Sequence, residues 1–322
     1  MRRNASRGHA MSESGRKVGV EIEFALLEAW EAAEAVAGAI GGEVRLHGTH
    51  VAFLEGSALG DLRFELDTRY AKPPRDPDFI DRALDELELR EAAADMLSYV
   101  VPVELVTGPL DAEGLRTLDR AIAALREAGA VGTRHSPLNA FGMHLNVECV
   151  PLTPARAIRV ASAYAFVEPW LRRQMEVDLA RRATPFVDPY PAGYLRALAR
   201  GSAEGTEPTL ARFIEVYAYW NPTRNRGLDM WPLLGHLDEA AAEAALEGPV
   251  KNARPTFHYR LPDSDIENPD WTPRTELARW DRIEGVADDD TAFDAVRAAC
   301  LRHQTWRIGR AEYDAVIARA MA

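Results

Sequence analysis

The chain has 322 residues, of which 47% are hydrophobic and 27% are charged. This composition is typical of a globular protein with a large core and excludes a disordered or fibrous chain. No apolar run approaches the ~20 residues that span a bilayer, so we expect no membrane partner. The formal net charge is -12, from 38 basic and 50 acidic residues. Such an acidic chain would be repelled by a phosphate backbone, so we expect no nucleic-acid partner.

The first 16 residues are basic and polar and lack the apolar stretch of a secretory signal. We interpret residues 1–16 as a disordered leader and expect one folded domain over residues 17–322. The two cysteines, Cys149 and Cys300, lie far apart and show no metal-type spacing. This usage is typical of reduced thiols and predicts a cytoplasmic location.

Alternation of apolar and polar residues with a period of two predicts several half-buried strands. In VGVEIEF the apolar residues share one parity, and Glu21 and Glu23 take the other. The pattern is typical of an antiparallel or mixed sheet. The segments that show it are residues 18–24, 62–69, 101–107, 141–149 and 256–261.

Helical patterns separate these strands, and the chain is nearly all helical in a block from about residue 154 to residue 247. Gly41 and Gly129 follow two of the patterns and predict their C-terminal ends. Strands early and late in the chain, with a helical insertion between them, predict an α+β fold with helices on one side of the sheet. The other expected helices cover residues 28–40, 77–98, 111–128 and 290 onward.

Carboxylates and imidazoles dominate the polar parity of the predicted strands, and lysine is absent from it. For any one strand this is also the pattern of a solvated sheet face. If the strands are neighbours, however, the like charges require a counter-charge, which divalent cations with oxygen and imidazole ligands would supply. The residues are Glu21, Glu23, Glu65, Asp67, Glu104, His144, Asn146, Glu148, His258 and Arg260.

Arginines on a turn form a second candidate cluster in WNPTRNRGLDM. Arg224 and Arg226 could bind phosphate or carboxylate oxygens in a bidentate manner, or they could pair with Asp229 or Asp238. Arg260 shares a strand face with His258 and is either a structural ion pair or an anion clamp.

Several other sites are not supported by the sequence. It contains neither a G-x-x-x-x-G-K-[ST] phosphate loop nor a G-x-G-x-x-G dinucleotide motif, and no nucleophile elbow. His47 and His50 lack a third ligand at a suitable spacing, so we interpret them as loop residues.

Five motifs, in this order, resemble the amidoligase family of the glutamine synthetase and glutamate–cysteine ligase superfamily. They are GVEIEF, ELVTGPL, FGMHLNVE, NPTRNRGLDMWPLL and RPTFHYRLP, and the resemblance runs from Val18 to Ala287. It implies a single catalytic domain with a curved, largely antiparallel sheet of about six strands. The concave face of that sheet would hold two or three Mg²⁺ ions and the phosphates of ATP.

The family often carries Glu-x-Arg on its late strand, whereas this chain has His258-Tyr259-Arg260. The number of metals is therefore open, and Glu276 is a possible substitute carboxylate. The resemblance implies roles for the matching residues. Metal ligands would be Glu21, Glu23, Glu65, Glu104, His144 and His258; ATP contacts would be Asn146, Arg224, His258 and Arg260; catalytic residues would be His144, Arg224, Arg226 and Arg260.

The implied reaction joins a carboxylate to an amine through an acyl phosphate and converts ATP to ADP. The substrates would be small-molecule or peptide carboxylates and amines, and a homo-oligomer is compatible with the superfamily. Two alternatives remain open at this point. One is a metal-dependent hydrolase that uses the same Glu and His cluster, and the other is a non-catalytic relative that binds nucleotide or metal.

Overall fold

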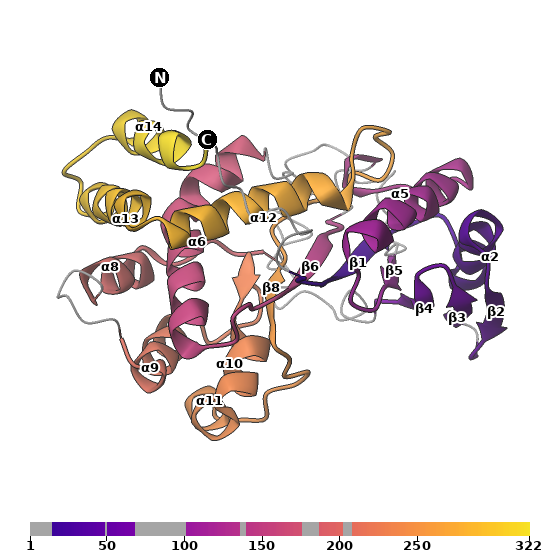
Figure 1. Cartoon of the computed structure of the whole chain (residues 1–322), viewed down its shortest axis with the longest axis horizontal. Helices are drawn as coiled ribbons and strands as arrows, with labels where there is room; N and C mark the ends of the chain where they lie inside the picture. Colours follow the sequence, from indigo (N-terminus) through magenta and orange to yellow (C-terminus); the bar gives the residue numbers. More distant parts are fainter. Residues whose placement is uncertain (1–14, 49, 68–100, 136–139, 176–186, 202–207) are drawn as a thin grey trace, which may run out of the picture.

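The computed structural model describes residues 15–48, 50–67, 101–135, 140–175, 187–201 and 208–322. In these residues the strands form one open sheet of eight strands in the order β2-β3-β4-β5-β1-β6-β8-β7. The expectation of about six strands is therefore corrected to eight. All named strand pairs are antiparallel, as the alternating pattern predicted. Figure 1 shows the sheet running from the indigo strands at one end to the orange strands at the other.

The two sides of the sheet follow the parity of the sequence. In β1 the residues Val18, Val20, Ile22 and Phe24 are all 0% exposed and belong to the main core. The strands are β1 (Val18–Phe24), β2 (Glu43–Leu46), β3 (Val51–Ser57), β4 (Gly60–Leu66), β5 (Val103–Val106), β6 (Met143–Glu148), β7 (Leu228–Asp229) and β8 (Thr256–Tyr259).

Ten helices surround the sheet in the described ranges, together with a short 3-10 turn at Thr133–His135. The α+β expectation is thus confirmed. The helices are α2 (Ala29–Ile40), α5 (Ala112–Glu127), α6 (Pro154–Gln174), α8 (Ala192–Gly201), α9 (Leu210–Trp220), α10 (Trp231–Leu237), α11 (Glu239–Leu246), α12 (Pro273–Asp288), α13 (Asp290–Gln304) and α14 (Arg310–Ala320).

Local signals explain where the predicted helices begin and end. A capping box between Glu28 and Glu31 starts α2, and Gly41 ends it with a φ of 75°. Asp111 starts α5 by accepting a 2.8 Å hydrogen bond from the backbone N–H of Gly114. The predicted helix over residues 77–98 lies outside the described residues.

Four elements were not predicted. The hairpin of β2 and β3 accounts for most of the difference in strand number, and His47 and His50 lie in its connection, as expected for loop residues. The two-residue strand β7 interrupts the block from 154 to 247, which otherwise consists of helices joined by loops where it is described. Helix α12 was also missed, although Pro273 in its first turn is a recognised start signal.

Helices cover the apolar side of the sheet. Helix α2 packs on β2, β3 and β4, and α5 packs on α2. Helix α12 contacts α6 and α5, and Figure 1 shows it running from α6 toward α5. Arg16 is buried and ion-paired to Asp281 and Glu284 of α12, which fixes the start of β1 against this layer. Within the described residues no helix is long and apolar enough to cross a membrane.

Candidate functional site

The register of the sheet brings the predicted polar residues together. Glu23 of β1 lies opposite Glu104 of β5, and Glu104 in turn lies opposite Glu65 of β4. On the other side of β1, Glu21 lies opposite His144 of β6. Glu65, Glu104 and Glu23 therefore form one row across the sheet, and Glu21 and His144 form a second row two residues away along β1.

Glu21 is held by two side chains of β6. Nδ1 of His144 lies 2.9 Å from Oε2 of Glu21. The side-chain amide of Asn146 donates a 2.8 Å hydrogen bond to Oε1 of the same carboxylate. Both oxygens of Glu21 are thus occupied, and its carboxylate has a fixed orientation.

Glu23 and Glu104 are buried carboxylates on neighbouring strands, with 2% and 6% of their surface exposed. Oε2 of Glu23 accepts a 2.7 Å hydrogen bond from the backbone N–H of Gly142. His144 lies between them, with Nε2 3.8 Å from Oε1 of Glu23 and Nδ1 4.0 Å from Oε1 of Glu104. The two carboxylates and the imidazole therefore offer ligand atoms to one cation.

His258 and Arg254 lie beside these residues, on the side of the site nearest β8. Nδ1 of His258 lies 2.9 Å from Oδ1 of Asn146. Arg254 donates from Nε and one terminal nitrogen to the same oxygen, at 3.1 and 2.6 Å. The same terminal nitrogen lies 3.9 Å from Oε1 of Glu21. Sequence reasoning missed Arg254, although it shares the parity of His258 and Arg260 and precedes the strand by only two residues.

Burial sets the charge states of these groups. Burial lowers the pKa of His144, although the hydrogen bond with Glu21 opposes this shift. Burial also lowers the pKa of His258, well below its usual range. For Glu21, burial alone would raise the pKa. The hydrogen bond with His144, the charge interactions with His258 and His144, and the hydrogen bond with Asn146 outweigh burial and hold the pKa well below its usual range. Glu21 is therefore ionised at neutral pH.

The predicted arginines have different surroundings. Arg260, 6% exposed, donates to the backbone carbonyl of Arg224 at 2.6 Å, and its charge contributes to lowering the pKa of both site histidines. Arg224 forms an ion pair with Asp229, as one of the two interpretations of the turn predicted, with Nε 2.9 Å from Oδ2. Arg226 donates to the backbone carbonyls of Pro189 and Trp220 at 2.7 and 3.4 Å. Its contacts are those of a residue that fixes the turn.

A close contact docks the arginine turn against the sheet. The backbone carbonyl of Gly227 accepts a 2.8 Å hydrogen bond from the N–H of Arg260. A Cβ atom on Gly227 would overlap the hydroxyl oxygen of Tyr164, so no larger residue fits without a shift. The turn that carries Arg224 is therefore held next to β8.

The remaining predicted residues lie at the margins. Glu65 is half-buried and paired with Arg63 at 3.0 Å. Glu148 is half-buried at the end of β6 and accepts a 2.8 Å hydrogen bond from the backbone N–H of Lys17. Glu276, on α12, is paired with Arg279. None of these three carboxylates belongs to the two groups of possible metal ligands that the structure brings together. Asp67, at the end of the β4 segment, is buried.

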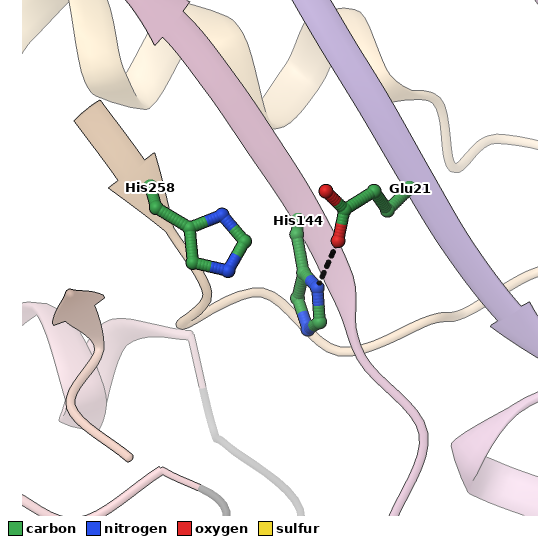
Figure 2. A group of neighbouring side chains, drawn as sticks. All are labelled: Glu21, His144 and His258. Atoms are coloured by element: carbon green, nitrogen blue, oxygen red, sulfur yellow. Dashed lines mark hydrogen bonds and ion pairs between the residues drawn. The ribbon is translucent and has the colours of Figure 1, made fainter. Parts of the chain in front are cut away.

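Two groups of side chains in the described part of the chain could each hold a metal ion. One is Glu21, His144 and His258, and the other is Glu23, Glu104 and His144. In each group one ligand atom per residue lies within 4.8 Å of the others. Figure 2 shows the first group, with the nitrogen-bearing edge of the His258 ring turned toward His144 and Glu21. The carboxylate-rich group fits a hard cation such as Mg²⁺, which prefers oxygen ligands.

An open antiparallel sheet with a buried Glu and His cluster defines a candidate metal-binding enzyme. A protein-family model described as "Putative amidoligase enzyme" matches residues 14–281 of the chain. The protein belongs to this amidoligase family, which confirms the resemblance noted in its motifs and indicates a ligase that forms amide bonds. Comparison with curated proteins and with solved structures gave no match.

Proposed function

We propose that this protein is an ATP- and Mg²⁺-dependent carboxylate–amine ligase that releases ADP and passes through an acyl phosphate. The observation that carries the proposal is the convergence of Glu21, Glu23, Glu104 and His144 from three strands into one buried cluster. The family assignment supports amide-bond formation. The open antiparallel sheet supports the related proposal of a glutamine synthetase-like fold.

The proposed metal ligands are the acidic residues in the middle of the sheet. Glu23 and Glu104 would hold a magnesium ion, with His144 beside them. The bound ion would neutralise charge on phosphate oxygens and hold them in place. The ligand atoms of these three residues lie within 4.8 Å of one another, which supports this role.

The proposed anion contacts come from the opposite end of the cluster. Arg260 is buried beside the histidines, and Arg254 reaches the Glu21 carboxylate from a partly exposed position. A guanidinium at either position would stabilise negative charge that develops on a transferred phosphoryl group. Arg224 remains 36% exposed despite its pair with Asp229 and could contribute further. Burial of the cluster would limit access of water to the acyl phosphate, which a ligase needs and a hydrolase does not.

A screen for ADP release tests the proposal. Purified protein would be incubated with ATP, Mg²⁺ and pooled carboxylates and amines, including short peptides. We expect ADP release that requires both a carboxylate and an amine and is lost in Glu23→Gln. The matched control is Glu34→Gln, an exposed carboxylate on α2, which should retain activity. Hydrolysis of a substrate without ATP, or ADP release that persists in Glu23→Gln, would contradict the proposal.

A further inference from the structure

The two candidate metal groups differ in chemistry although they share His144. The group of Glu23 and Glu104 has two carboxylates and one imidazole, whereas the group of Glu21 has one carboxylate and two imidazoles. The difference arises from His258, which is the third member of the group where the other group has a second carboxylate. Magnesium binds oxygen ligands and gives up its water reluctantly, whereas imidazole ligands favour first-row transition metals.

Asn146 orients His258 for metal binding. Its Oδ1 receives two hydrogen bonds from Arg254 and lies 2.9 Å from Nδ1 of His258. The terminal nitrogen of Arg254 also lies 3.1 Å from the same Nδ1. These contacts hold the Nδ1 side of the ring in place, while Nε2 makes no hydrogen bond with any residue that the structure describes. Contacts that fix the orientation of the ring in this way are typical of metal-binding histidines.

His258 is packed against the other imidazole of the group. The ring is 4% exposed and lies against the ring of His144, with centroids 5.2 Å apart and planes at 76°. The two imidazoles are therefore held as neighbours, in positions from which both can bind one ion.

The three donors need little movement to share an ion. Their ligand atoms lie within 4.8 Å of one another, and ligands roughly 2.1 Å from a metal lie roughly 3–4 Å apart. An ion between Glu21 and His144 would take the place of the proton in their 2.9 Å hydrogen bond. Glu21 is 16% exposed at its side chain, so the position has access to solvent.

We propose that Glu21, His144 and His258 form a binding position for a first-row transition-metal ion and prefer such an ion to Mg²⁺. The inference rests on the proposed function, because it assigns one cation of the same site. It makes the protein a mixed-metal enzyme. A hard cation would lie at Glu23 and Glu104, and a second ion would lie at the neighbouring group of Glu21, His144 and His258. Two imidazoles and one carboxylate are a donor set that such metals use widely.

The test uses Co²⁺ as a spectroscopic probe of the metal-free protein. We expect visible absorption bands that saturate at one Co²⁺ per chain, that Zn²⁺ abolishes, and that Mg²⁺ in about a thousandfold excess leaves in place. In His258→Gln the bands should shift and the Co²⁺ affinity should fall about 10- to 100-fold or more. The control His236→Gln removes an exposed histidine on α10 and should match the wild type.

A second variant separates the loss of the imidazole from the loss of the fold. His258→Glu restores a carboxylate, so it should bind a divalent ion while the preference for Zn²⁺ over Mg²⁺ falls at least about tenfold. The inference is overturned if Mg²⁺ displaces Co²⁺ at comparable concentrations, or if His258→Gln leaves bands and affinity unchanged. Direct competition in the wild type decides the question even if a variant is unstable.

The outcomes distinguish this inference from the proposed function. If one Co²⁺ binds through His258 but ATP never binds, the transition-metal position stands and the ligase proposal fails. If ATP and Mg²⁺ bind while the Co²⁺ bands do not depend on His258, the ligase proposal stands and this inference fails.

Discussion

The two faces of the sheet are built from the same strands but have different roles. Along β1, Val20 and Ile22 are completely buried in the main core, while Glu21 and Glu23 alternate with them on the other face. Each apolar side chain contributes roughly 1.5–3 kcal/mol when it is fully buried. The carboxylates contribute nothing of this kind, because burial of a charge is unfavourable unless it is paired.

The apolar face therefore accounts for the stability of the sheet, and the polar face carries the candidate site. The following predictions test that division of roles, from the largest expected effect to the smallest.

Removal of side-chain volume from the apolar face should lower the free energy of unfolding more than any other change proposed below. Leu145 is 0% exposed on β6 and lies opposite Val20 and Tyr259 on the adjacent strands. We expect Leu145→Ala to lower the free energy of unfolding by about 2–5 kcal/mol, measured by urea denaturation. The control Leu145→Met should lose less than about 1.5 kcal/mol. A loss below about 1 kcal/mol for the alanine variant would contradict the core role of this face.

Arg224 should matter for stability through Asp229. Asp229 is 0% exposed, and its Oδ2 accepts the 2.9 Å hydrogen bond from Nε of Arg224. Arg224→Ala leaves this carboxylate without that partner, so we expect a loss of about 1–3 kcal/mol in thermal or urea unfolding. The double variant Arg224→Ala/Asp229→Asn should recover part of the loss. If the single variant is as stable as the wild type, Arg224 has no structural role.

Glu23→Gln should affect metal binding without loss of stability. Glutamine can still accept the 2.7 Å hydrogen bond from the backbone N–H of Gly142, so this contact is kept. We expect Mg²⁺ affinity to fall at least about tenfold, measured by calorimetry. Unfolding should occur at the same or a higher urea concentration than in the wild type. A variant that loses both stability and Mg²⁺ binding would show that the carboxylate is structural.

The cysteines should have the smallest effect, because both belong to the apolar core. Burial raises the pKa of Cys149 to about 11 and that of Cys300 to about 12, so few molecules carry a thiolate at neutral pH. We expect neither thiol to react with Ellman's reagent in the native protein at pH 8. Both should react after unfolding in guanidinium chloride. Rapid reaction of either thiol in the folded protein would place it outside the core.

The apolar face could be predicted well from the sequence, and the site only in part. Parity alone identified β1 to the residue, and it placed Glu21, Glu23 and His144 on one face. Which of them meet depends on strand order and register, which have no local signal in the sequence. The contact of His144 with Glu21 joins residues 123 positions apart.

The missed features have physical reasons. The strand β2 has only four residues and a largely exposed surface, so its alternation is weak. Arg254 precedes the regular part of β8, and its role depends on the amide of Asn146, which is 108 positions away. The choice between the two readings of Arg224 depended on the burial of Asp229, which the sequence does not reveal.

The most direct test of the account is a calorimetric titration of ATP into the protein with and without Mg²⁺. The wild type and Glu34→Gln should bind ATP only when Mg²⁺ is present. Glu23→Gln should lose that binding, because its carboxylate is one of the two proposed magnesium ligands. Absence of ATP binding at every Mg²⁺ concentration, or binding that does not depend on Glu23, would contradict the claim that this face is a magnesium–nucleotide site.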